Sequence, residues 1–152
     1  MSWSVIGGVI CLVLAISVQM WLAADRNSLT WDEGDHLYAG FMSWVTGDFG
    51  INPEHPPLVK LVSALPLLNM GLPVPVTEDR FFKTEGFLGG KDFLFRNDAN
   101  AMVFRARVAS SIFTILLALA VFFGARGMFG TAAGFVDPAL LAFEPNVIAH
   151  SA

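Results

Sequence analysis

The sequence predicts an all-α integral membrane protein, with about three transmembrane helices and a long loop that carries shorter helices at the membrane surface. The chain is 55% hydrophobic and 14% charged, with a mean hydropathy of +0.60, whereas a soluble domain carries about 25% charged residues. One apolar stretch of bilayer-crossing length near the N-terminus carries no charge, and a second, over residues 106–125, carries only Arg107. Most of the acidic residues lie between these stretches, in residues 25–104, which indicates a polar loop between membrane spans.

The first predicted element is a transmembrane helix over residues 1–24. Residues 3–24 contain no charged side chain, and at about 1.5 Å per residue they can cross a hydrocarbon core of about 30 Å. Trp3 and Trp21 stand near the two ends, where aromatic side chains favour the interface. A signal peptide is the alternative, but no Lys or Arg precedes the apolar run, which is also longer than a signal peptide requires.

Two later apolar stretches predict a second and a third transmembrane helix, over residues 105–126 and 131–149. The short "GMFG" segment between them predicts a tight turn, so the two helices should be antiparallel neighbours. Asp137 makes the third stretch less apolar than the others. Arg126 beside the turn indicates the cytoplasmic side, which puts the loop 25–104 on the outer face of the membrane.

The loop begins with a predicted amphipathic helix over residues 31–46. Thr30 and Glu33 match a capping box, in which two side chains satisfy backbone amides at a helix start. Apolar residues then recur at helical spacing up to Gly47, which is suited to the end of a helix. Such a helix can lie along the membrane surface with its apolar face toward the lipid.

A second loop helix is predicted over residues 57–70. Pro57 is suited to the first helical turn, and apolar spacing continues after it. The segment is short for a span and contains Lys60, so we expect an interfacial or re-entrant helix. Residues 73–104 are polar and rich in turn residues, and they contain no phosphate-binding glycine loop.

Four ionisable side chains gather at the start of the first loop helix: Asp32, Glu33, Asp35 and His36. Acidic residues in a first helical turn are stabilised by the helix dipole by about 0.3–1 kcal/mol each, which explains one or two of them. Asp32 and His36 are four positions apart and share a face of the helix. The cluster therefore indicates either helix capping or a site that uses carboxylates, and the sequence leaves both open.

A second small cluster, Glu54 and His55, stands just before two consecutive prolines. Together with His36, these side chains offer oxygen and nitrogen ligands to a divalent ion. A structural hydrogen bond is the alternative role for a lone histidine. The formal net charge of −4 argues against nucleic acid as a partner, because nucleic acid attracts basic surfaces.

Four segments together resemble a known family: "TWDEGDHLYAG", "GDFGINPEHPPLVKLVSALPLL", "RARVASSI" and "AFEPNVIAHSA". They are similar to the beginning of the phospholipid-carrier-dependent glycosyltransferases, which include protein O-mannosyltransferases and the aminoarabinose transferases of lipid A. The resemblance implies a polytopic helical bundle of the GT-C architecture, of which this chain is the N-terminal portion. The lack of a eukaryotic targeting pattern favours the bacterial inner membrane.

The resemblance implies transfer of a sugar from a polyprenyl-phosphate donor to a protein hydroxyl or a lipid outside the cytoplasm. Asp32 matches the catalytic base of the family, and Glu33 is its neighbour. Glu54 matches an acidic position that contacts a metal in some relatives, so a divalent metal ion is the one cofactor expected. His55 stands where some relatives carry a lysine that contacts the donor phosphate.

Positive charge must also offset the charge that develops on the leaving phosphate. The candidates for donor binding are Lys60, Arg105 and Arg107, together with His36 and His55. Anchoring at the membrane interface is the alternative role of the two arginines. Two other functions remain open at this stage. One is an oligosaccharyltransferase-like enzyme, and the other is a non-catalytic membrane subunit or transporter fragment whose acidic loop binds cations or a partner.

Overall fold

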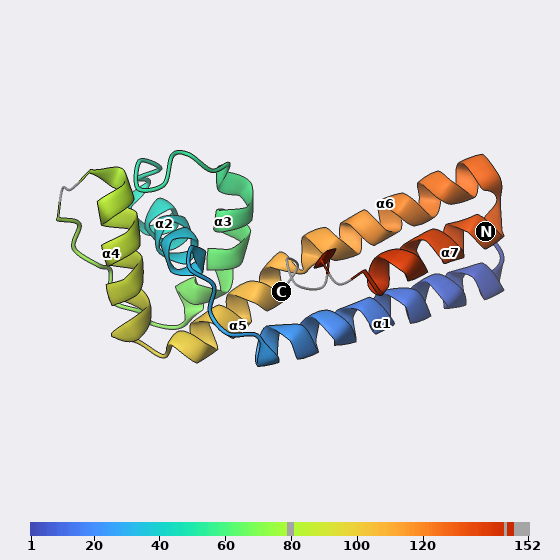
Figure 1. The fold of residues 1–152 in the computed structure, drawn as a ribbon, viewed down its shortest axis with the longest axis horizontal. Helices are drawn as coiled ribbons and strands as arrows, with labels where there is room; N and C mark the ends of the chain where they lie inside the picture. The colour runs from blue at the N-terminus through green and yellow to red at the C-terminus, as the bar shows by residue number, and fades with distance from the viewer. Residues whose placement is uncertain (79–80, 145, 148–152) are drawn as a thin grey trace. The chain divides into compact units, whose positions relative to one another are not determined.

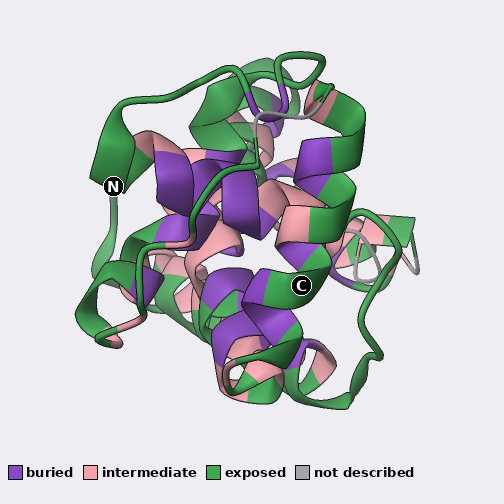
Figure 2. Cartoon of the chain, turned by 90° about the vertical axis from the view of Figure 1, so that its left-hand side faces the viewer, coloured by how far each residue is buried: buried purple, intermediate pink, exposed green. Residues whose placement is uncertain are grey.

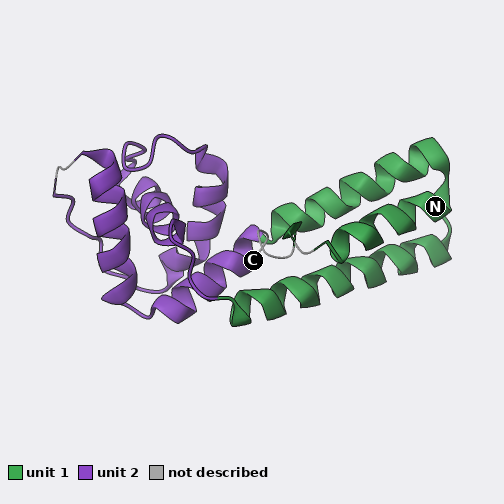
Figure 3. Cartoon of the chain, in the orientation of Figure 1, with its two compact units in different colours: residues 1–27, 111–152 green, residues 28–110 purple. Residues whose placement is uncertain are grey.

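The computed structural model describes residues 1–78, 81–144 and 146–147, and every regular element within them is a helix (Figure 1). The prediction of an all-helical chain is therefore confirmed for the described residues. The chain divides into two compact units (Figure 3). The apolar unit combines Met1–Asn27 with Ser111–Ala152, and the loop unit is Ser28–Ser110.

The helices of the apolar unit are α1 (Trp3–Arg26), α6 (Ile112–Phe129) and α7 (Thr131–Ala142). α6 and α7 pack side by side and are joined at Gly130, whose φ of 93° suits glycine. Gly134 allows their close approach, because a Cβ there would lie 2.9 Å from the Cβ of Arg126. The connection is shorter than the predicted "GMFG" turn, since α6 continues through Phe129.

Among the residues that the structure describes, two helical stretches are long and apolar enough to cross a membrane, Trp3–Arg26 and Ala99–Phe129. The third predicted span differs from this expectation, because α7 has 12 residues and ends at Ala142, whereas a span needs about 20. The residue before a proline is biased away from helical geometry, and Glu144 stands before Pro145 in the sequence. Residues 145, 148 and 149 of the predicted span lie outside the described residues.

The elements of the loop unit are α2 (Glu33–Thr46), α3 (Pro57–Ala64), a 3-10 helix (Leu65–Asn69), α4 (Phe82–Phe95) and α5 (Ala99–Ser110). The helices predicted over 31–46 and 57–70 correspond to α2 and to α3 with its 3-10 extension. The α-helical part gives way to the 3-10 helix near Pro66, whose nitrogen cannot donate a hydrogen bond.

α2 lies at the centre of the loop unit and packs against α3 and α4. Its Tyr38 is completely buried, as is Leu67 of the 3-10 helix. The buried residues gather on the inner sides of the helices (Figure 2). The apolar core of this unit comprises Leu37, Tyr38, Ala39, Phe41, Met42, Ile51, Ala64, Leu67, Phe93, Leu94, Met102, Val103 and Ala106. Burial of this core is the main contribution to the stability of the unit.

α4 is a helix that the polar, glycine-containing sequence of residues 73–104 does not predict. Each interior glycine disfavours a helix by about 1 kcal/mol relative to alanine. Here the glycines allow close contact with α2. A Cβ at Gly90 would lie 2.6 Å from the carbonyl oxygen of Gly34, and a Cβ at Gly89 would lie 2.5 Å from the ring of Tyr38. Tertiary packing therefore overrides the weak local propensity.

Candidate functional site

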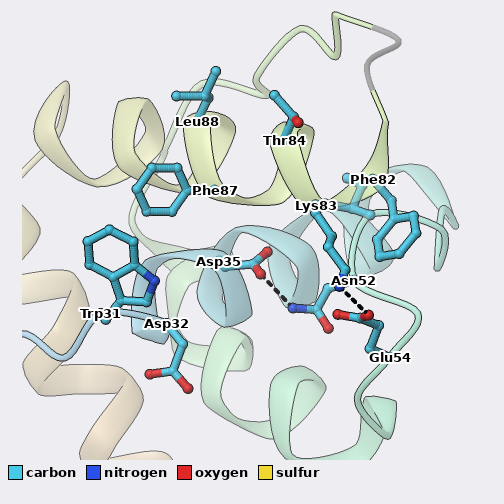
Figure 4. Close-up of a pocket in the computed structure, with 11 residues that line it drawn as sticks. Trp31, Asp32, Asp35, Asn52, Glu54, Phe82, Lys83, Thr84, Phe87 and Leu88 are labelled. Carbon is cyan, nitrogen blue, oxygen red and sulfur yellow. Dashed lines mark hydrogen bonds and ion pairs between the residues drawn. The ribbon is translucent and has the colours of Figure 1, made fainter.

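Asp32 immediately precedes α2 and is the most open acid of the predicted cluster. Its side chain is 65% exposed, and its carboxylate lies 3.6 Å from Nε2 of His36, beyond normal hydrogen-bond length. Asp32 makes no side-chain capping bond to α2. Figure 4 shows its carboxylate pointing away from Asp35 and Asn52. Asp32 therefore keeps its carboxylate available to a ligand.

Glu33, by contrast, is held inside the fold. Its Oε1 accepts a hydrogen bond from Nε of Arg107 at 2.6 Å, and its Oε2 accepts one from Nη2 at 2.8 Å. The Arg107 side chain is only 4% exposed, and it also donates to the carbonyl oxygen of Ser28 at 2.9 Å. This bidentate pair fastens the start of α2 to α5. Both charges are used within the fold, although the sequence suggests catalytic support for Glu33 and donor binding for Arg107.

The predicted capping box is formed only in part. Oε2 of Glu33 accepts hydrogen bonds from the backbone N–H of Thr30 at 3.1 Å and from its hydroxyl at 3.3 Å. However, α2 begins at Glu33 itself, so the capping position falls on Asp32 rather than Thr30. The carboxylate of Glu33 therefore has two roles: it accepts hydrogen bonds from Thr30 in the local turn, and it pairs with Arg107 of α5.

Asp35 belongs to a partly buried polar chain that links α2, the segment before α3, and α3 itself. Its Oδ2 accepts a hydrogen bond from Nδ2 of Asn52 at 2.7 Å, and its buried Oδ1 has no partner among the described residues. The buried ammonium of Lys60 donates to the backbone carbonyl of Asn52 and to its Oδ1, the latter at 3.3 Å. Lys60, a predicted donor-binding residue, thus positions Asn52, and burial lowers the pKa of its ammonium.

Gly86 of α4 makes room for this arrangement, because a Cβ there would lie 2.2 Å from Oδ1 of Asp35. Burial is the main cause that raises the pKa of Asp35 above its ordinary 3.8, although the hydrogen bond from Asn52 opposes the shift. The carboxyl group of Asp35 therefore takes up a proton more readily than an exposed aspartate does.

Replacing Asp35 with asparagine is expected to raise the free energy of unfolding at neutral pH. Because folding raises the pKa of Asp35, its ionised form destabilises the folded state above the ordinary pKa of 3.8. The advantage of the variant should therefore shrink as the pH falls toward 3.8 and disappear below it. Denaturant titrations of both proteins across this pH range measure the effect. An advantage that grows as the pH falls would contradict the expectation.

His36 and His55, which the sequence places in the donor site, lie next to each other. Their ring centroids are 4.8 Å apart in an edge-on arrangement. Burial is the main cause that lowers the pKa of His36 below 6.5, so its imidazole is neutral at neutral pH. Its Nδ1 is buried without a partner among the described residues. A neutral His36 is poorly suited to neutralising a phosphate.

Glu54, the predicted metal ligand, forms an ion pair with Lys83 of α4 at 2.9 Å. Within the described part of the chain, no group of three His, Cys, Asp or Glu side chains is arranged to hold a metal ion. The carboxylate of Glu54 is thus engaged by a lysine in this structure. Arg105, another predicted donor-binding residue, is exposed on α5.

A pocket of about 460 Å³ opens beside Asp32, between the start of α2, the segment before α3, and α4 (Figure 4). We call it the Trp31 pocket. It is lined by Trp31, Asp32, Asp35, Ile51, Asn52, Glu54, Phe82, Lys83, Thr84, Phe87 and Leu88. The sequence points to the acids in this group but not to the aromatic residues. The positions of Trp31 and Phe87 in the sequence do not predict their contact, because the two side chains meet only when α4 packs on α2.

A second polar contact that the sequence does not suggest joins α2 to α4. The hydroxyl of the buried Tyr38 donates to Oε1 of Glu85 at 3.0 Å. Oε2 of Glu85 accepts a hydrogen bond from the backbone N–H of Glu78 at 3.3 Å. Burial is the main cause that raises the pKa of Tyr38, so its hydroxyl stays protonated as a donor. The pair helps to position α4, which forms one wall of the pocket.

The fold and the site define a class: a helical protein with two helices long and apolar enough to cross a membrane, and a compact helical unit that follows the first of them in the chain. Comparison with protein-family models, with curated proteins and with solved structures gives no match for this chain. Its function must therefore be argued from the site.

Proposed function

We propose that this protein is part of a membrane glycosyltransferase that moves a sugar from a polyprenyl-phosphate donor to a hydroxyl acceptor on the outer face of the membrane. The observation that carries this proposal is the difference between neighbouring acids. Asp32 is 65% exposed and free of any lysine or arginine ion pair among the described residues, while Glu33 is fixed by Arg107. The resemblance of the surrounding motifs to carrier-dependent glycosyltransferases supports the same function.

The chemistry requires a base close to the lipid surface, since a lipid-linked sugar holds its reactive carbon there. Only residues 27–32 separate Glu33, where α2 begins, from Arg26, where the candidate span α1 ends. The ion pair between Glu33 and Arg107 and the buried face of α2 make this start of the helix rigid. A rigid support is what a base needs in order to meet an incoming hydroxyl.

In the proposed reaction, Asp32 removes the proton of the acceptor hydroxyl as its oxygen bonds to the anomeric carbon of the sugar. The bond between that carbon and the phosphate oxygen breaks, and polyprenyl phosphate leaves with the electron pair. A positioned base of this kind contributes about 10²–10⁴-fold to the rate. Of the predicted cations, Arg105 is exposed and available to the phosphate, whereas Lys60 and Arg107 are engaged within the fold.

Asp32→Asn is expected to slow sugar transfer by at least about 100-fold, because the amide cannot accept the hydroxyl proton. Binding of the donor should persist, since the two side chains have nearly the same shape. The assay uses the full-length protein in vesicles with polyprenyl-phosphate hexoses and pentoses, and it follows the release of polyprenyl phosphate. Asp25→Asn, which alters an exposed aspartate outside the cluster, is the matched control.

Unchanged transfer in Asp32→Asn would exclude Asp32 as the base. Absence of donor binding and of transfer in the unmodified protein would instead favour a non-catalytic membrane subunit. One observation favours that second candidate: Glu33, Lys60 and Arg107 all use their charges to hold the fold together. In a loop unit with a purely structural role, these charged residues would need no other function.

A further inference from the structure

The Trp31 pocket has the size and the position of a ligand site. Its volume of about 460 Å³ lies within the range of about 300–1,000 Å³ found for small-molecule sites. Asp32, the proposed base, is one of its lining residues. A molecule bound in the pocket therefore lies next to the residue that the proposed reaction uses as its base.

One wall of the pocket is formed by two stacked aromatic side chains. Trp31 and Phe87 are stacked with ring centroids 4.8 Å apart and an interplanar angle of 29°. Trp31 nevertheless remains 82% exposed, and a large exposed aromatic side chain held by a stacking partner is typical of a recognition surface. The C–H face of a pyranose ring is apolar and flat, so it packs well on such an indole.

The remaining lining groups suit hydroxyl groups rather than anions. Three acidic residues, Asp32, Asp35 and Glu54, line the pocket together with Asn52. Carboxylates accept hydrogen bonds from sugar hydroxyls and repel phosphate. Among the described lining residues the one cation is Lys83, and its ammonium is paired with Glu54 at 2.9 Å.

We infer that the Trp31 pocket binds a saccharide ring that carries no negative charge, with one face of the ring against Trp31 and its hydroxyls toward Asp35 and Glu54. Under the proposed function, on which this assignment of role rests, the ring is the acceptor and is bound next to Asp32. The donor phosphate then binds outside this pocket, because three carboxylates oppose it.

The test compares two probes on the full-length protein in detergent micelles. Methyl α-glucopyranoside is neutral, and glucose 6-phosphate carries the same ring with a negative charge. Saturation-transfer NMR titrations should give a dissociation constant at least about tenfold lower for the neutral probe. Trp31→Ala should weaken its binding at least about tenfold, whereas Trp31→Phe should restore part of the affinity. Trp3→Ala changes a tryptophan of the apolar unit that is 87% exposed, and it is the matched control.

A second variant tests the charge argument. Glu54→Gln removes a carboxylate and releases Lys83 from its ion pair, so binding of glucose 6-phosphate should improve relative to the neutral probe. Equal or tighter binding of the phosphorylated probe by the unmodified protein would overturn the inference, as would unchanged binding in Trp31→Ala. A short threonine-containing peptide that competes with the neutral probe would also overturn it, because the site would then accept a peptide.

These binding measurements need neither donor lipid nor catalysis, so they separate the two proposals. Binding of the saccharide without any transfer activity would sustain the pocket assignment and count against the transferase. Transfer that is lost in Asp32→Asn but unaffected by Trp31→Ala would sustain the transferase and count against the pocket as its acceptor site.

Discussion

Arg107→Met is expected to lower the free energy of unfolding by about 3–5 kcal/mol, because it leaves the carboxylate of Glu33 partly buried without its cation. Arg107 is 4% exposed and makes two hydrogen bonds to Glu33 and one to the carbonyl oxygen of Ser28. Methionine is similar in length and apolar, so the loss arises from the missing charge and donors rather than from a cavity. Denaturant unfolding followed by far-UV ellipticity measures the change.

Arg105→Met is the matched control, because Arg105 stands on the same helix but is exposed. Surface substitutions of this kind usually change stability by no more than about 0.5 kcal/mol. The double variant Glu33→Gln with Arg107→Met should recover part of the loss, since removing both partners of a buried ion pair costs less than removing one. A loss of similar size in Arg105→Met and Arg107→Met would show that the buried pair has no special role.

Gly40→Ala is the second substitution with a large expected effect, at about 3 kcal/mol of lost stability, the upper part of the usual range for overpacking. A Cβ at Gly40 would lie 2.3 Å from the carbonyl oxygen of Lys60 and 2.8 Å from its carbonyl carbon. These are backbone atoms of α3, so no side-chain rotation relieves the clash and the two helices must separate. The shift also disturbs Lys60, which holds Asn52 in place beneath the Trp31 pocket.

Gly124→Ala is the control for this change, because a Cβ at Gly124 of α6 would have no neighbour within 4 Å. Alanine is favoured over glycine in a helix interior by about 0.5–1 kcal/mol, so this variant should be slightly more stable. The melting temperature should thus fall in Gly40→Ala and rise in Gly124→Ala when thermal unfolding is measured. Equal stabilisation by both substitutions would show that the close crossing of α2 and α3 does not limit the fold.

The helical class and much of the element plan could be predicted from the sequence, because both depend on short-range patterns. The charge-free run before Asp25 and the apolar spacing after Pro57 are visible without any tertiary contact. α4 could not be predicted, since its glycines disfavour a helix locally and become useful only against Gly34 and Tyr38 of α2. The length of α7 also differs from the prediction, because the apolar stretch of residues 131–149 predicts one span, whereas α7 ends at Ala142.

The candidate site could also be predicted from the sequence only in part. The cluster at Asp32, Glu33, Asp35 and His36 is visible in the sequence as a concentration of ionisable side chains. The aromatic wall of the Trp31 pocket is not, because Phe87 belongs to α4 and meets Trp31 only through the packing of that helix. Lys60 shows the reverse case: the sequence suggests a cation for the donor phosphate, whereas the fold buries it against Asn52.

The amino-acid sequence by itself determined that this protein is helical, that it has apolar stretches of membrane-crossing length, and that acids gather at the start of one helix. Tertiary structure alone decided which of those acids is open. Glu33 and Arg107 are separated by 74 positions, and periodicity and capping act only over a turn or two of helix. Their pairing depends on how α2 and α5 pack, and it is this packing that leaves Asp32 as the exposed carboxylate.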